Sequence, residues 1–195
     1  MGRVTSHPDA LHWNYRYQQE KRAGFERPRP LLLEHLWRLP DHGLALDAAM
    51  GLGGNAGCLL AHGMRVVGID VSDTALRLAK ARYPALMAVQ ADLVQFYLPE
   101  NTFDVILNFF YLERRIWPDY SLSLKPGGLL IFETLTEAML SIHPEINPLY
   151  LLSPGELLHG FPELEILVYH EGWIEGVTQH PRAVASLVAL KNTQA

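Results

Sequence analysis

Residues 46–55 read Leu-Asp-Ala-Ala-Met-Gly-Leu-Gly-Gly-Asn, and they join an apolar run to a stretch of small residues. The apolar run predicts a buried strand, and residues 55–62 predict a helix. Glycines at such a junction let the backbone approach a ligand closely and direct amide groups toward it. On their own, Gly51, Gly53 and Ala56 fit the G-x-G-x-x-G/A dinucleotide fingerprint only weakly, and a plain tight turn would also use glycines.

Apolar runs alternate with helical stretches along most of the chain. Strands are predicted at 44–49, 65–70, 86–90, 103–109 and 128–134. Their lack of alternation between apolar and polar residues indicates burial on both faces, as in a parallel sheet. Ser72 is the expected N-cap of a helix that buries Leu76, Leu78 and Ala79 and ends before Pro84. This alternation predicts a doubly wound α/β fold.

The two ends of the chain follow a different pattern. Residues 153–156, Ser-Pro-Gly-Glu, fit a capping box, so we expect a short helix that begins there and ends by Gly160. Strands are predicted at 164–169 and 183–189, and the connection between them is too short for a crossover helix, so they should pair antiparallel. Ahead of the first strand, residues 10–38 predict a helical segment that prolines interrupt.

Composition and charge narrow the class of protein. With 195 residues, of which 49% are apolar, we expect one structural domain, made of a cap segment at 1–38 and a main part at 39–195. The net charge of −5 argues against a nucleic-acid-binding surface. The single cysteine, Cys58, leaves no intrachain disulfide, and the nine histidines show no metal-binding spacing. No membrane span or signal peptide is evident, so a cytoplasmic location is expected.

Two aspartates follow predicted strands at the same edge of the sheet. Asp70 lies 19 residues beyond Gly51, where a carboxylate can accept hydrogen bonds from both ribose hydroxyls of an adenosine group. The same charge would repel a 2′-phosphate and disfavours NADP. Asp92 follows the third strand, and it has two readings: acceptance of an adenine amino group, or an N-cap of a helix that begins at Leu93.

Together these motifs resemble the class I S-adenosylmethionine-dependent methyltransferases. Asp47 begins a D-x-G-x-G-x-G loop, and residues 124–128, Leu-Lys-Pro-Gly-Gly, are similar to the turn that these enzymes place before their fifth strand. One departure is Ala49, which replaces the first glycine of the loop. Its methyl group is tolerable if the residue keeps a negative φ angle.

The resemblance implies a Rossmann-like, seven-stranded, mostly parallel sheet of order 3-2-1-4-5-7-6, with strand 7 antiparallel and an N-terminal helical cap. It also implies that S-adenosylmethionine is bound outside the carboxyl ends of the strands. Gly51 and Gly53 would lie behind the methionyl part, Asp70 would bind the ribose and Asp92 the adenine. Asn108 would offer its backbone carbonyl to the cofactor's ammonium group. The full set of expected cofactor-binding residues is Trp13, Tyr17, Asp47, Ala49, Gly51, Gly53, Asp70, Val71, Asp92, Leu93, Asn108 and Phe109.

Within that family, the chain is similar to small tellurite-resistance-type and thiopurine-type methyltransferases. Residues 13–17, Trp-Asn-Tyr-Arg-Tyr, resemble their W-(D/N)-x-x-Y entry segment. Residues 103–112 resemble their fourth strand and its exit, and residues 153–157 match their P/E-G-E-L turn.

Methyl transfer from a sulfonium is an in-line displacement in which the protein mainly positions the acceptor. No buried acid–base pair is evident near the strand ends. We therefore predict a small acceptor that is polarizable or anionic, such as a thiol or a chalcogen oxyanion, because soft nucleophiles need no strong base. Tyr111, Arg114 and Arg182 are the candidate catalytic residues, and Tyr17 is a further candidate for the acceptor pocket. A monomer or homodimer is expected, without nucleic-acid, membrane or metal partners.

Two alternatives remain open on the sequence. A nicotinamide-dependent oxidoreductase would share the fold and the glycine-rich loop. A non-catalytic S-adenosylmethionine-binding protein would share the whole cofactor site.

Overall fold

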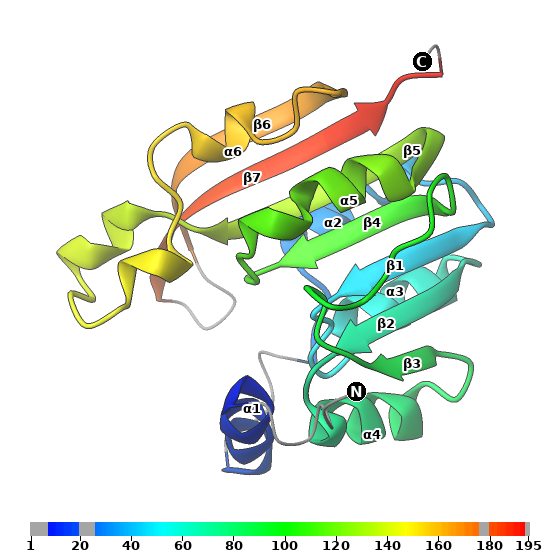
Figure 1. Cartoon of the computed structure of the whole chain (residues 1–195), viewed down its shortest axis with the longest axis horizontal. Helices are drawn as coiled ribbons and strands as arrows, with labels where there is room; N and C mark the ends of the chain where they lie inside the picture. The colour runs from blue at the N-terminus through cyan, green and yellow to red at the C-terminus, as the bar shows by residue number, and fades with distance from the viewer. Residues whose placement is uncertain (1–7, 20–25, 176–179, 194–195) are drawn as a thin grey trace. The chain divides into compact units, whose positions relative to one another are not determined.

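The computed structural model describes residues 8–19, 26–175 and 180–193. Its strands form a sheet of order β3-β2-β1-β4-β5-β7-β6, which confirms the predicted fold (Figure 1). The strands are β1 (Leu44–Ala48), β2 (Arg65–Asp70), β3 (Met87–Gln90), β4 (Phe103–Phe109), β5 (Leu124–Leu135), β6 (Leu164–Glu175) and β7 (Pro181–Lys191). The pairs β1–β2, β2–β3 and β4–β5 are parallel, whereas β7 is antiparallel to both β5 and β6.

Helices connect these strands. They are α1 (Pro8–Gln19), α2 (Pro30–Glu34), α3 (Gly54–Ala61), α4 (Asp73–Arg82), α5 (Trp117–Ser123) and α6 (Glu156–His159), with 3-10 turns η3 (Leu36–Arg38), η4 (Arg114–Ile116), η5 (Glu137–Ser141) and η6 (Pro148–Tyr150). In the described part of the chain, no helix is long and apolar enough to cross a membrane. Of the predicted N-terminal segment, residues 1–7 and 20–25 lie outside the described residues.

The chain divides into two compact units, Met1–Tyr97 and Leu98–Ala195. In the first unit, α1 lies beside α4 (Figure 1). Ser72 caps α4 as predicted, since its side chain accepts a hydrogen bond from the Ala75 amide at 3.1 Å. The side chain of Asn14 on α1 accepts bonds from the Ser72 hydroxyl at 2.6 Å and from the Thr74 amide at 3.2 Å. Helix α1 is therefore fastened to the N-terminal end of α4.

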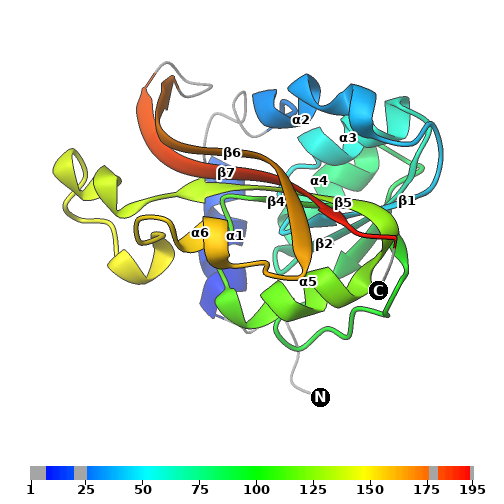
Figure 2. The same cartoon turned by 90° about the horizontal axis from the view of Figure 1, so that it is seen from above.

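In the second unit, α5 packs along β5, and β6 runs beside β7 (Figure 2). The core between α5 and the sheet is aromatic: Trp117 stacks on Phe161 with ring centroids 5.2 Å apart and meets the edge of Phe132 at 5.8 Å. All three rings are buried, so this cluster removes a large apolar area from water.

Two expectations about local structure were wrong in the second unit. The Leu-Lys-Pro-Gly-Gly segment at 124–128 is part of β5, which begins at Leu124 and contains an irregularity in its pairing with β4. Helix α6 begins after Gly155, which has a φ angle of 72°, and not at the predicted capping box. The Ser153 hydroxyl donates to Glu137 at 2.8 Å, so it does not cap the helix. The helix does end at Gly160, as predicted.

Candidate functional site

The loop after β1 has a left-handed backbone at three positions. The φ angle is 50° at Ala49, 55° at Gly51 and 74° at Gly53. A Cβ atom added to Gly51 would lie 2.8 Å from the hydroxyl oxygen of Tyr17, so both its φ angle and the close approach of Tyr17 require glycine. The condition for tolerating the Ala49 methyl group without strain, a negative φ angle, is not met. An alanine therefore occupies a backbone conformation that suits glycine.

Replacing Ala49 with glycine should relieve this strain. The left-handed conformation costs an L-residue about 1–2 kcal/mol, part of which the extra freedom of an unfolded glycine offsets, so we expect Ala49→Gly to raise the free energy of unfolding by up to about 1 kcal/mol. Urea denaturation would measure it. Ala56→Gly, the same change inside α3, should have the opposite sign, and an Ala49→Gly protein no more stable than the wild type would contradict the strain.

Asp70, at the end of β2, connects the glycine-rich loop after β1 to the residues that follow β2. Its side chain is only 6% exposed. One carboxylate oxygen accepts a hydrogen bond from the Gly51 amide at 2.8 Å, and the other accepts one from the Ser72 amide at 2.8 Å. Burial raises the pKa of Asp70 to about 6, while the backbone bonds from Ser72 and Gly51 oppose that rise. Asp70 thus holds the glycine-rich loop against the start of α4.

Asp47, on β1, is the second buried carboxylate of this unit. It is 1% exposed, and its Oδ2 atom has no hydrogen-bond partner among the described residues. Burial raises its pKa to about 8, and the neighbouring Asp70 adds to the rise; a backbone hydrogen bond from Ala56 and the charge of Arg29 act in the opposite direction. A buried carboxyl oxygen without a partner is costly, so the site is suited to a ligand that brings a cationic or hydroxyl donor; a cationic donor would also favour loss of the Asp47 proton.

The raised pKa of Asp47 makes the stability of the protein depend on pH. In the native state Asp47 keeps its proton up to about pH 8, whereas in the unfolded chain it is released near its ordinary value of 3.8. The stabilising proton is fully present below that ordinary value and is lost as the pH rises toward 8. Between pH 6 and 8 we expect the free energy of unfolding to fall by up to about 1.4 kcal/mol per pH unit.

Urea titrations at pH 6 and pH 8 measure this slope. Asp47→Asn should flatten it, because the amide does not ionise. Asp73→Asn removes a carboxylate that is partly exposed on α4 and should keep the wild-type slope. An equal slope in the wild type and Asp47→Asn would contradict the assignment of the proton to Asp47.

The predicted cap residues lie against the glycine-rich loop. Trp13 and Tyr17 stack with ring centroids 5.6 Å apart, and the guanidinium of Arg16 lies 5.0 Å from the centroid of Trp13. Tyr17 is buried and packs against Leu52. Sequence reasoning missed the residue that fixes this helix, Asn14, although it lies inside the quoted Trp-Asn-Tyr-Arg-Tyr motif. A polar side chain among aromatic residues was the available signal.

Asp92 and its neighbours form a turn instead of a helix. The Asp92 carboxylate accepts from the Val94 amide at 3.0 Å and from the Gln95 side chain at 2.9 Å. No helix begins at Leu93, so the N-cap interpretation was wrong, although the bond to the Val94 amide is of the kind that caps make. The backbone carbonyl of Val71 accepts a hydrogen bond from Gln90 at 3.2 Å, which fastens the exit of β2 to β3.

In the second unit, the exit of β4 is held by the Asn108 side chain. Asn108 donates to the carbonyl of Tyr111 at 2.7 Å and accepts from the hydroxyl of Tyr120 at 3.0 Å. Between them Phe109 is buried, and Phe110 has a φ angle of 57°, which is rare for a bulky residue. Strained backbone of this kind is common at functional sites.

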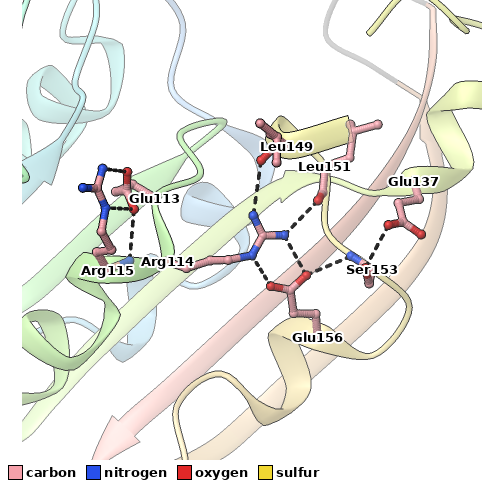
Figure 3. Close-up of polar contacts among 8 residues, drawn as sticks. All are labelled: Glu113, Arg114, Arg115, Glu137, Leu149, Leu151, Ser153 and Glu156. Carbon is pink, nitrogen blue, oxygen red and sulfur yellow. Dashed lines mark hydrogen bonds and ion pairs between the residues drawn. The ribbon is translucent and has the colours of Figure 1, made fainter. Parts of the chain in front are cut away.

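Arg114 is partly exposed, and its guanidinium has three hydrogen-bond partners (Figure 3). Its guanidinium makes two hydrogen bonds to the carboxylate of Glu156 and donates to the carbonyls of Leu149 at 3.2 Å and Leu151 at 3.0 Å. Glu156 also accepts from the Ser153 amide at 2.9 Å and raises the pKa of Arg114. Arg114 thus ties η4 to the segment that precedes α6.

Arg182 has a different environment. At the start of β7, its guanidinium lies 5.0 Å from the ring centroid of Phe110, and burial lowers its pKa, an effect that the charge of Glu133 opposes. Glu133 on β5 is 6% exposed and accepts a hydrogen bond from the Ser186 hydroxyl at 2.9 Å. Sequence reasoning missed this buried carboxylate. The available signal was a single carboxylate within an otherwise apolar strand.

No group of three or more His, Cys, Asp or Glu side chains in the described residues is arranged to hold a metal ion.

Comparisons with known proteins agree with this arrangement. Residues 46–132 match the family model of a methyltransferase domain. A probable S-adenosylmethionine-dependent methyltransferase of Mycobacterium tuberculosis is 30% identical over 94 residues, which are 46% of this chain and 34% of the relative. The chain thus spans about a third of the length of the curated relatives that it matches.

Solved structures share the fold at low sequence identity. An S-adenosylmethionine-dependent methyltransferase from Methanosarcina mazei superposes with a TM-score of 0.71 at 17% identity, over 86% of this chain and 100% of the other. Geranyl diphosphate C-methyltransferase from Streptomyces coelicolor, solved with Mg²⁺, geranyl diphosphate and S-adenosyl-L-homocysteine, has a TM-score of 0.69 at 13% identity, over 95% and 98% of the two chains.

Proposed function

We propose that this chain, whose residues 46–132 match the family model of a methyltransferase domain, is a class I S-adenosylmethionine-dependent methyltransferase that transfers a methyl group to a small-molecule acceptor. The observation that carries the proposal is the pair of buried carboxylates beside the glycine-rich loop. Asp47 has an oxygen without a hydrogen-bond partner among the described residues, and Asp70 holds the Gly51 amide in place. Acceptors of this kind suit the hydroxyl and ammonium groups of S-adenosylmethionine.

The residues of the first unit fit the cofactor by their chemistry. Asp70 would accept from the ribose hydroxyls and Asp92 from the adenine amino group, with Val71 and Leu93 beside them. Gly51 and Gly53 would leave room for the methionyl part, and Trp13 and Tyr17 would cover it. Asn108 and Phe109 are the cofactor-binding residues proposed in the second unit. When bound, the cofactor supplies an electrophilic methyl group on a sulfonium.

The protein's own contribution is to orient the acceptor and to exclude water. Thiols and chalcogen oxyanions are the first acceptor class to assay, because they need the least help from a base. Of the three candidate residues, Arg182 has the geometry of a ligand-binding group, whereas the donors of Arg114 are taken by Glu156 and two carbonyls. Tyr111 remains a candidate at the exit of β4.

The closer relation to tellurite- and thiopurine-type enzymes stays a prediction. A single domain with residues 1–38 as its cap, a cytoplasmic location and a monomeric or dimeric state are predictions as well.

Calorimetric titration with S-adenosylhomocysteine tests the cofactor site. We expect Asp70→Asn to weaken binding by about tenfold or more, because charge-assisted hydrogen bonds to the ribose are lost. Asp73→Asn, which removes the same charge three residues away on α4, should bind as the wild type does. Thermal melting of each variant separates loss of binding from loss of folding.

Three outcomes would contradict parts of the proposal. Unchanged affinity for S-adenosylhomocysteine in Asp70→Asn would show that the cofactor does not bind beside this loop. Binding of NADH without binding of S-adenosylhomocysteine would favour an oxidoreductase. Tight cofactor binding without transfer of a radiolabelled methyl group to any member of an acceptor panel would favour a non-catalytic binding protein.

A further inference from the structure

The second unit contains five Lys and Arg residues, and four of them have partners within it. Arg114 pairs with Glu156, Arg115 with Glu113 and Lys125 with Asp104. Lys191 donates to the carbonyls of Leu122 and Leu124 and to the side chain of Asn101. Within the described part of this unit, Arg182 is the one member of the five without a hydrogen bond or an ion pair.

The side chain of Arg182 is nonetheless half-buried. Its guanidinium lies over the ring of Phe110, a residue with a left-handed backbone at the exit of β4. A guanidinium stays protonated in proteins, so partial burial removes some of its hydration. Its N–H donors find no acceptor among the described residues of this unit and stay accessible to a ligand. The charge of the buried Glu133 compensates for part of that loss, without a direct hydrogen bond to Arg182.

We propose that Arg182, Phe110 and Glu133 form an anion-binding subsite for the methyl acceptor, specific for a carboxylate or phosphate group on a flat apolar skeleton. The inference rests on the proposed function in that the bound molecule is the acceptor. The guanidinium binds the anionic oxygens through its planar fork of donors. The Phe110 ring packs against the skeleton. Glu133 is a positioning residue, because it stabilises the charge of Arg182 while the subsite holds no anion.

Binding of simple probes tests the subsite without knowledge of the acceptor. Benzoate and phenyl phosphate carry the two anionic groups on a flat ring, and benzamide is the neutral control. Each is titrated by calorimetry into the protein alone and into the protein saturated with S-adenosylhomocysteine. NMR of the Arg182 Nε–H group reports binding at this position. We expect at least one anion to bind and to shift that signal, and benzamide to bind more weakly.

Arg182→Gln should weaken binding of the anion by about 10- to 100-fold, since charge-assisted hydrogen bonds are lost. Arg115→Gln removes the same charge from an exposed arginine of the same unit and should leave the affinity unchanged. In Glu133→Gln the amide oxygen can still accept the hydrogen bond from Ser186, and the negative charge that repels the bound anion is removed. This variant should therefore bind the anion about 3- to 10-fold more tightly. A merely structural role for Glu133 would not produce a gain.

If Arg182→Gln melts far below the wild type, Arg182→Lys decides the point, because it retains the charge and loses the planar fork; we expect it to bind the anion more weakly than the wild type. The inference is overturned if neither anion binds the wild type, if benzamide binds as tightly as benzoate, or if the Arg182 variants bind the anion as tightly as the wild type does. If the wild type binds the anion but not S-adenosylhomocysteine, the result counts against the proposed function and not against the subsite. The titrations of the protein alone test the subsite in that case.

Discussion

The carboxylate of Asp70 accepts hydrogen bonds from Gly51 on one side and from Ser72 on the other, and the first unit is organised around it. Ser72 in turn caps α4 and donates to Asn14, so the same chain of contacts continues into α1. Tyr17 on that helix approaches Gly51 so closely that an added Cβ atom would lie 2.8 Å from its hydroxyl oxygen. One buried acidic group thereby links the glycine-rich loop, the helix after β2 and the N-terminal helix.

This arrangement buries the carboxyl groups of Asp47 and Asp70 almost completely. Burial raises the pKa of both. More backbone amides donate hydrogen bonds to Asp70 than to Asp47, so the pKa of Asp70 rises less. Ala49 adds backbone strain to the same loop. Strained backbone and buried acceptors lower stability, and proteins commonly retain them where a ligand is bound. The stability of the loop and its capacity to bind a ligand are therefore opposing demands on the same few residues.

Much of this architecture follows from the sequence, for a definite reason. Strands buried on both faces need continuous apolar runs, and the resemblance in residues 46–55 and at Asp70 supplied the sheet order. Local details were harder. The φ angle of Ala49 is set by the tertiary position of the loop. The Ser153 hydroxyl binds Glu137, 16 residues away, and the Glu156 carboxylate binds Arg114, 42 residues away, so the contacts that replace the capping box come from distant parts of the sequence.

The same limit applies to the second unit. Glu133 reads as an isolated charge in an apolar strand, and only the register of β5 with β7 brings Ser186 opposite it. Arg114 and Arg182 were both candidate catalytic residues. What distinguishes them is that Arg114 has hydrogen-bond partners within its unit, and the local sequence does not show this.

The central claim is that the buried carboxylates beside the glycine-rich loop bind the adenosyl cofactor. A crystal structure of the complex with S-adenosylhomocysteine tests it most directly. The account predicts that the ribose hydroxyls lie within hydrogen-bond distance of the Asp70 carboxylate and that Oδ2 of Asp47 gains a donor from the ligand or from an ordered water bound to it. A cofactor bound elsewhere, with Asp70 contacting only Gly51 and Ser72 and Asp47 still without a donor, would contradict it.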